Sequence, residues 1–243
     1  MINFEFNCVR GYDINEVWRD AMWLCIKNGY DFVVEKGSYE GQIRKQLDSV
    51  FITITNPETR PLAPILPAGI PAPTDDDKIA TYFVNQLMGS EKAENEEYTY
   101  GEFITKQIDR IIDLLIEPGG NTNQATICIG NSDTTFLPDP PCLRSISFKV
   151  VNGKLNMTLY FRSWDLYAGL PENLGGLQLL KEFVFDSIYG YFPVEDGSTF
   201  AYSDGLHIYE QYFDLVNQLN VDKININKMV TMDKIRYLSQ HGK

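Results

Sequence analysis

Cysteine is scarce in this chain of 243 residues, which has four, at positions 8, 25, 128 and 142. No two of them form a CxxC pair, so the usual spacing of a zinc site is missing and we expect no metal. Four cysteines are also too few for a small secreted domain held together by disulfides. The cysteine content therefore predicts a protein of the reducing cytoplasm.

Positive charge and long apolar runs are also in short supply. Lysine and arginine number 21 against 33 aspartates and glutamates, which gives a formal net charge of −12. A broad nucleic-acid surface needs a basic face, so we expect no DNA partner, while RNA binding and a local pocket for a small anion stay open. The first ten residues, MINFEFNCVR, lack a basic segment followed by a long apolar one, and no later stretch is apolar for long enough to cross a bilayer. We therefore expect a soluble, cytoplasmic protein with no membrane partner.

The composition does provide material for a sizeable core, with 44% hydrophobic and 13% aromatic residues. Residues 57–77 are crowded with proline, which predicts a loop that follows the surface. Because this stretch is short and partly apolar, it does not read as a linker between domains. We expect a single domain that spans residues 1–243.

Clusters of β-rich segments flanked by helical periodicity predict an α+β fold. Asp13, followed by Glu16, predicts the N-cap of a first helix, and Gly29 predicts its end. The clearest hairpin in the chain turns at Asn152-Gly153. The other predicted strands lie at 48–55 and 124–130, and the other predicted helices at 78–89, 101–116, 174–189, 205–218 and 225–239.

The stretch PDPPCLRS, residues 138–145, places three prolines just before Cys142. Proline fixes its own φ and restricts the residue before it, so this turn holds the thiol in one direction. Arg162, at the end of the second hairpin strand, returns close to Cys142, and a neighbouring guanidinium lowers the pKa of a thiol. Together with Ser163 it also suits a phosphate. Cys142 is thus either a nucleophile or a small apolar residue at a strand edge, and Arg162 either its activator or a solvated charge.

Three segments together resemble the folate-dependent thymidylate synthase family with a nucleophilic cysteine, particularly its shorter archaeal-type members. They are PPCLRS, YFRSWDLYAGLPENLGG and GLHIY, which occur in the family's order within residues 138–215, and YTYGE at 98–102 is a weaker match. The resemblance implies a thymidylate synthase-like fold, with a large mixed β-sheet flanked by helices. It also implies a homodimer formed through one face of that sheet.

The activity that this resemblance implies is the reductive methylation of dUMP to dTMP. The co-substrate would be 5,10-methylene-tetrahydrofolate or an archaeal tetrahydropterin, and the Cys142 thiolate would add to C6 of the pyrimidine. A tightly fixed thiol serves such a reaction because small displacements are costly. Two alternatives stay open: a pyrimidine-nucleotide hydroxymethylase of the same family, and a catalytically inactive relative that only binds nucleotides.

The remaining roles also come from the resemblance. Arg162 and Ser163 match residues that bind the nucleotide phosphate, and Arg162 also lies near the catalytic sulfur. Asp165 matches a catalytic aspartate between pyrimidine and pterin, and Gly169 matches a turn beside the cofactor.

Three further positions match residues that read the nucleoside. Asn173 matches the asparagine that reads the pyrimidine edge, since an amide pairs with both O4 and N3–H of uracil. Relatives that act on cytosine nucleotides typically have aspartate there. His207 and Tyr209 match the pair that contacts the deoxyribose 3′-hydroxyl.

The chain departs from the family pattern where a pair of arginines usually reaches the partner subunit's phosphate, because Asn123-Gln124 stand there. Candidates to replace them are Arg44, Arg60 and Arg144. We rank Arg144 first, since residues two apart on a strand share a face and Arg144 lies two beyond Cys142. The alternative is that Arg144 pairs with a carboxylate across the strands.

The cofactor half of the pattern is less complete. No glutamate aligns with the family's catalytic one, and Glu97 and Glu102 are weak candidates. The segment KIRYLSQHGK, residues 234–243, lacks the family's short apolar tail. The sequence leaves the one-carbon donor and the general base open.

Overall fold

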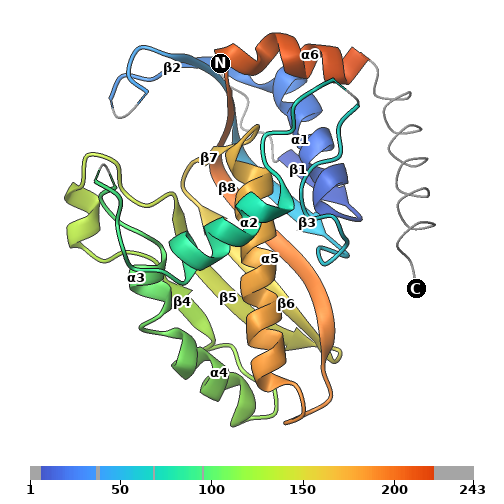
Figure 1. The fold of residues 1–243 in the computed structure, drawn as a ribbon, viewed down its shortest axis with the longest axis vertical. Helices are drawn as coiled ribbons and strands as arrows, with labels where there is room; N and C mark the ends of the chain where they lie inside the picture. Colours follow the sequence, from blue (N-terminus) through green and yellow to red (C-terminus); the bar gives the residue numbers. More distant parts are fainter. Residues whose placement is uncertain (1–6, 37–38, 68, 95, 222–243) are drawn as a thin grey trace.

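A computed structural model describes residues 7–36, 39–67, 69–94 and 96–221 of the chain. Its centre is a mixed sheet, which contains eight strands among these residues in the order β1-β3-β8-β6-β5-β4, with β2 beside β3 and β7 beside β8. Figure 1 shows this sheet behind the long helix α5. The strands are β1 Asn7–Gly11, β2 Tyr30–Val33, β3 Ile43–Ile54, β4 Thr126–Cys128, β5 Leu143–Val151, β6 Lys154–Phe161, β7 Trp164–Asp165 and β8 Glu195–Tyr209.

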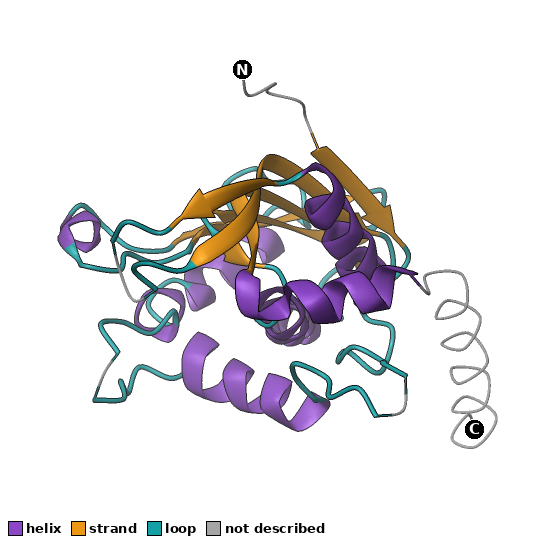
Figure 2. Cartoon of the chain, turned by 90° about the horizontal axis from the view of Figure 1, so that it is seen from above, coloured by secondary structure: helices purple, strands orange, loops and turns teal. Residues whose placement is uncertain are grey.

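The longer helices gather on one side of the sheet (Figure 2). On β3, Val50, Ile52 and Ile54 are almost fully buried toward these helices, whereas Phe51 is 42% exposed on the other face. The alternation follows from the two-residue period of a strand. The helices are α1 Ile14–Asn28, α2 Asp76–Tyr82, α3 Gly101–Ile104, α4 Ile108–Ile116, α5 Gly169–Ile188 and α6 Phe213–Val221, with a π-turn at Phe83–Leu87 and 3₁₀ turns at Asp133–Phe136 and Glu210–Tyr212. None of the described helices is long and apolar enough to cross a membrane.

The predicted start and end of the first helix are confirmed. The Asp13 carboxylate accepts a hydrogen bond from the backbone N–H of Glu16 over 2.9 Å, and Glu16 accepts one from the N–H of Tyr12. The helix ends at Gly29, whose N–H donates to the carbonyl of Cys25. One otherwise unpaired N–H of the first turn, and the N–H of Tyr12 just before the helix, are thereby satisfied by side chains.

The hairpin β5–β6 is also confirmed, and it fixes the most important contact of the site. Asn152 and Gly153 have φ values of 53° and 74°, the left-handed pair that a two-residue hairpin turn requires. At the other end of the hairpin, the N–H of Arg162 donates to the carbonyl of Cys142 over 2.9 Å. The turn chemistry therefore sets which residue lies beside the thiol.

Helix α2 packs directly on α5 because two glycines of α5 leave room for it. A Cβ at Gly175 would lie 2.8 Å from Ile79, and one at Gly176 would lie 2.5 Å from the ring of Tyr82. These contacts position Tyr82 near the start of α5. The two glycines thus help to build the layer behind the site.

The proline-rich stretch is a loop, as predicted, and it packs into the core. Asn15 holds it, donating to the carbonyl of Ala63 over 3.3 Å and accepting from the N–H of Ile65 over 2.7 Å. Leu62 is buried in the same hydrophobic cluster as the helices. The loop is therefore part of the main core.

The helix predicted at 205–218 is wrong over its first part. Residues 205–209 form the end of β8, which pairs with β3 on one side and with β7 on the other, and α6 begins at Phe213. All five residues of this segment are buried, so both faces of the strand are covered and exposure does not alternate along it. The helix predicted at 101–116 is interrupted between α3 and α4, and the helix at 174–189 begins earlier, at Gly169. The helix predicted at 225–239 lies outside the described residues.

Candidate active site

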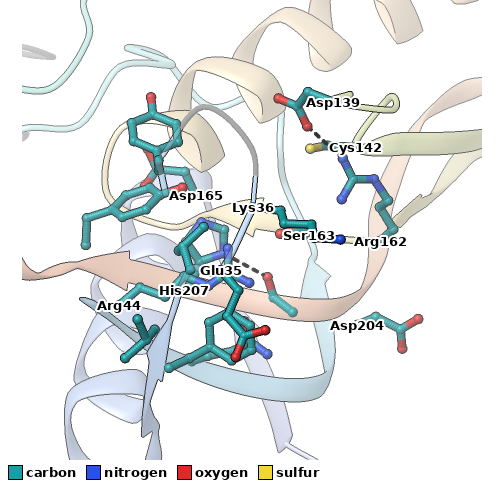
Figure 3. A pocket seen from close by; sticks show the side chains of 17 residues that line it. Glu35, Lys36, Arg44, Asp139, Cys142, Arg162, Ser163, Asp165, Asp204 and His207 are labelled. Carbon is teal, nitrogen blue, oxygen red and sulfur yellow. Dashed lines mark hydrogen bonds and ion pairs between the residues drawn. The ribbon is translucent and has the colours of Figure 1, made fainter. Parts of the chain in front are cut away.

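A cavity of about 820 Å³ lies where the ends of β2, β3 and β8 meet the segment between β6 and α5. Figure 3 shows the carboxylate of Asp139, the sulfur of Cys142 and the guanidinium of Arg162 together on one side, with Asp165 and His207 opposite. The structure thus brings six of the predicted site residues to one cavity. They are Cys142, Arg162, Ser163, Asp165, His207 and Tyr209.

The Cys142 thiol is free and largely buried. Burial raises its pKa, while Arg162, Arg44 and Arg144 lower the pKa and Asp139 raises it further. The net direction is upward, although Arg162 lowers the pKa of the thiol as expected. The guanidinium acts as predicted, but removal from water outweighs it.

Arg162 is held by the proline-rich turn that precedes the thiol. Its Nε donates to the carbonyl of Pro141 over 3.2 Å, and its Nη2 donates to the Asp139 carboxylate over 3.0 Å and to the carbonyl of Pro140. Both prolines lie before β5 begins at Leu143, so their carbonyls stand outside the strand ladder and face the guanidinium. The turn therefore orients the arginine as well as the cysteine.

Asp165 faces the cavity from β7, just before α5 begins. Its Oδ1 accepts from the N–H groups of Tyr167 over 3.0 Å and Ala168 over 3.4 Å. Burial nevertheless raises the pKa of this carboxyl. Gly169 follows, where a Cβ would lie 3.3 Å from that of Asp165. A residue without a side chain therefore allows the close return of the chain.

His207 is buried, with 4% of its surface exposed, and its Nδ1 lies 3.0 Å from the carbonyl of Gly205. Burial, aided by Arg44, lowers the pKa of the imidazole to about 3, so the ring is neutral at pH 7. A neutral ring that donates from Nδ1 presents Nε2 as an acceptor. The ring lies edge-on to Tyr209 at 5.0 Å, and burial raises the pKa of that phenol to about 12.

Asn173, Gly169 and Arg144 are not among the residues that line the cavity. The Oδ1 of Asn173 accepts from the indole N–H of Trp164 over 2.9 Å. The register of β5 against β6 shifts between Leu143 and Ser145, so the strand-alternation argument for Arg144 fails at that bulge. Arg60 pairs with Glu182 at 2.7 Å, away from the cavity. Of the three candidate arginines only Arg44 lines the cavity, so the geometry favours Arg44 over Arg144, which we ranked first.

Comparison with known proteins identifies the family. The family model for thymidylate synthase matches residues 84–238. This chain belongs to the thymidylate synthase family. A Methanosarcina acetivorans protein described as "Putative thymidylate synthase" is 30% identical over 220 residues, which cover 87% of this chain and 93% of the relative. Thymidylate synthase of Listeria monocytogenes is 28% identical over 131 residues, or 52% of this chain and 40% of that protein.

The fold comparison agrees with the family assignment. Thermostable thymidylate synthase A from Bacillus subtilis superposes with a TM-score of 0.62 at 17% identity, covering 84% of this chain and 83% of that one. At this identity the likeness concerns the fold alone. The predicted fold, a large mixed sheet flanked by helices, is confirmed.

Several residues of the thymidylate synthase cavity were not found from the sequence. Lys36, Tyr39 and Gln46 line it from the β2–β3 segment, which precedes the part matched by the family model. The Arg44 guanidinium lies 4.5 Å from the ring of Phe32, and its Nε has no hydrogen-bond partner among the described residues. Of these residues only Arg44 was named from the sequence, as a candidate to replace the family's arginine pair.

A layer of tyrosines lies behind Cys142. Tyr98 and Tyr100 stand with their rings 5.6 Å apart, and the Tyr100 hydroxyl lies 3.5 Å from the N–H of Leu143. Burial raises the pKa of Tyr98 to about 12 and those of Tyr82 and Tyr100 well above their usual value. The weak YTYGE match of the thymidylate synthase pattern thus supplies residues that pack on the segment that holds Cys142.

Neither glutamate considered for the thymidylate synthase pattern lines the cavity. Glu102 pairs with Lys92 at 3.1 Å, and Glu97 accepts from the N–H of Asp139 over 3.3 Å. In the described part of the chain, no group of three His, Cys, Asp or Glu side chains is placed to hold a metal ion. The general base stays unassigned.

Proposed function

We propose that this protein is a thymidylate synthase that methylates dUMP to dTMP with a reduced pterin as one-carbon donor. The observation that carries the proposal is the meeting of Cys142, Arg162, Asp165 and His207 in one cavity, given the family. A volume of about 820 Å³ falls in the range of small-molecule sites. The reaction needs a thiol, an anion-binding group and polar contacts for a sugar, and this cavity has all three.

The nucleotide would enter with its phosphate toward the cations. Arg162 offers a planar fork that suits phosphate, and Ser163 adds a hydroxyl beside it. Arg44 and Lys36 line the same cavity from another part of the chain, so they take the place that we expected Arg144 to fill. His207 presents an acceptor nitrogen and Tyr209 a hydroxyl, a pair that suits the deoxyribose 3′-hydroxyl.

Uracil recognition by Asn173 requires its side chain to turn. The amide oxygen now accepts from the indole N–H of Trp164, the residue between Ser163 and Asp165. An amide turned into the cavity would match both O4 and N3–H of uracil. We propose that nucleotide binding exchanges the Trp164 contact for the pyrimidine edge.

The chemistry of the Cys142 step follows from its surroundings. A thiolate adds to C6 of the pyrimidine, forming an S–C6 bond, and the C5–C6 π electrons move to C5 as an enolate. C5 would then take up the one-carbon unit as that unit's bond to its carrier nitrogen breaks, and C5 would lose its proton. Once a hydride has reduced the unit to a methyl group, the S–C6 bond breaks to release the thiolate. Because burial raises the pKa of Cys142, its proton must leave when the nucleotide enters, and Arg162 and Arg44 favour that loss.

The cavity also suits a pterin. The Asp165 carboxyl accepts hydrogen bonds, which fits the N–H groups of a pterin ring, and Phe32, Val33 and Val34 provide an apolar wall. When bound, the reduced pterin supplies the one-carbon unit and the hydride. Asp165 and the chain at Gly169 would orient it beside the pyrimidine. Tetrahydrofolate and an archaeal tetrahydropterin both fit this description.

We also propose a homodimer, formed through the sheet face that no described helix covers (Figure 2). Phe51, Tyr202 and Tyr160 form a row there, with ring centroids 4.9 Å and 5.6 Å apart. Aromatic residues on an open sheet face suit burial against a second copy. Light scattering after size exclusion should give twice the chain mass of 27.8 kDa, and a mass of one chain at micromolar concentration would refute the dimer.

Turnover of dUMP tests the proposed reaction directly. The protein is incubated with dUMP and either methylene-tetrahydrofolate or methylene-tetrahydromethanopterin, and dTMP and dihydropterin are both measured. We expect the two products in equal amounts with at least one carrier, and none from Cys142→Ser, which should still bind dUMP. A hydroxymethyl product without dihydropterin would identify the hydroxymethylase. Bound nucleotide with no covalent adduct to 5-fluoro-dUMP in the intact mass would identify an inactive relative.

A further inference from the structure

Asp139 belongs to the site, although no role was expected for it. It lies three residues before Cys142, within the proline-rich turn, and it lines the cavity. Its Oδ1 stands 3.0 Å from Nη2 of Arg162, the group that we assign to the phosphate. Figure 3 shows its carboxylate beside both the sulfur and the guanidinium.

The pair between Asp139 and Arg162 is suited to exchange. The two side chains are 56% and 35% exposed, and ion pairs with such access to water contribute little to stability. A phosphate carries up to two charges and three acceptor oxygens, so it is the stronger partner for a guanidinium. The backbone contacts of Arg162 to Pro140 and Pro141 do not depend on the carboxylate and keep the arginine in place.

We propose that Asp139 is a placeholder anion: its carboxylate occupies Arg162 in the free protein, the phosphate of the nucleotide displaces it, and until then its charge adds to burial in keeping the Cys142 thiol protonated. This inference rests on the proposed function, since it takes the phosphate from dUMP. In this role Asp139 weakens nucleotide binding and protects the Cys142 thiol while the site is empty of nucleotide.

The second half of the inference follows from the charges around the sulfur. Among the described residues, Asp139 is the carboxylate that raises the pKa of Cys142, and Arg162, Arg44 and Arg144 lower it. Glu97 accepts a hydrogen bond from the N–H of Asp139. The titratable tyrosines behind the sulfur are Tyr82, Tyr98 and Tyr100, which burial keeps neutral at pH 7. Removal of the Asp139 charge therefore leaves the thiol facing mainly cations.

Asp139→Asn tests both halves, because the amide oxygen still accepts from Arg162 while the charge is gone. Asp133→Asn is the matched control, since it removes one exposed carboxylate from the 3₁₀ turn before the proline-rich segment. The affinities of dUMP, deoxyuridine and inorganic phosphate are measured by calorimetry. We expect Asp139→Asn to bind dUMP and phosphate about threefold more tightly, the size of an exposed ion pair, and deoxyuridine unchanged.

The rate of alkylation in the absence of nucleotide measures the reactivity of the Cys142 thiol. Iodoacetamide is added over a range of pH, and the Cys142 peptide is followed by mass spectrometry with the exposed Cys8 and Cys128 as internal references. We expect Asp139→Asn to react about threefold faster at Cys142 at pH 8 than the wild type or Asp133→Asn, because the thiolate is the reactive form. The references should react at unchanged rates.

The outcomes separate this inference from the proposed function. Equal alkylation rates in the two variants, or weaker phosphate binding in Asp139→Asn, would overturn the placeholder and make Asp139 a support for Arg162 instead. If both expected effects are seen but dUMP is not turned over, the placeholder role of Asp139 is supported and the proposed synthase activity is contradicted.

Discussion

The backbone N–H of Arg162 donates to the carbonyl of Cys142, and this single ladder bond closes the open end of the β5–β6 hairpin. The thiol and the guanidinium are therefore fixed by backbone pairing, and the side chain of Arg162 is then oriented by the carbonyls of Pro140 and Pro141. These contacts to the two carbonyls depend on the planar shape of the guanidinium as much as on its charge.

Arg162→Lys should therefore impair the protein although the charge is conserved. An ammonium cannot donate in a planar fork to two carbonyls and a phosphate at once. We expect dUMP affinity to fall by about tenfold, the loss of one or two charge-assisted hydrogen bonds. Arg60→Lys, which alters an ion pair with Glu182 away from the cavity, is the control and should bind dUMP normally. Isothermal titration decides the matter, and equal affinities for the two variants would contradict the assignment.

His207 should make the stability of the protein depend on pH in the acid range. Its folded-state pKa is lowered to about 3, below the usual 6.5, so the unfolded chain binds a proton more readily than the native protein does. The corresponding stability is present above pH 6.5 and is lost progressively as the pH falls toward 3. We expect the wild type to lose more free energy of unfolding between pH 7 and pH 4 than His207→Asn loses.

Urea unfolding of both proteins at several pH values gives this difference, in which the other titrating groups largely cancel. Parallel stability curves for the two proteins would show that His207 is not buried as a neutral ring.

The part of the site that depends on local pairing was predictable. The Asn-Gly turn sets the hairpin register, and the register sets the neighbours Cys142 and Arg162. Arg44 was not ranked first because its place depends on the pairing of β3 with β8, where Arg44 lies opposite Tyr209. No local pattern encodes a contact between segments so far apart in the sequence.

The ranking of Arg144 and the helix predicted at 205–218 also depended on sequence patterns that the fold does not follow. The bulge beside Arg144 breaks the alternation on which its ranking depended. The segment GLHIY pairs with β3 on one side and with β7 on the other, and a helical pattern read over 205–218 does not reveal these long-range contacts. The direction of the Cys142 pKa was missed for a third reason, since burial is a property of the whole fold.

Asn173→Asp should shift the substrate preference from dUMP toward dCMP. A carboxylate can still accept from the indole of Trp164, so the local structure should hold. It offers no donor to O4 of uracil, but as an acceptor it suits the amino group of cytosine. The ratio of kcat/KM for dUMP to that for dCMP should fall by about a hundredfold or more, as for other sites that lose a specific hydrogen bond. Asn173→Leu, which cannot bond to either base or to Trp164, should lose activity on both. An unchanged ratio in Asn173→Asp would remove Asn173 from the site.

Gly176→Ala should destabilise the protein through the contact between α5 and α2. The new Cβ would lie 2.5 Å from Cδ1 of Tyr82 and 3.4 Å from Leu87, and a ring carbon in a packed layer cannot yield as a flexible chain end does. Alanine favours the helix itself, so any loss of stability must come from overpacking, at a cost of about 1–3 kcal/mol. Ser187→Ala, at a partly exposed position of the same helix, is the control and should change the melting temperature little. Because Tyr82 belongs to the tyrosine layer behind Cys142, the Gly176 variant should also alter the alkylation rate of Cys142. A variant as stable as the wild type would mean that α2 is free to move away from α5 and does not hold the wall of the site.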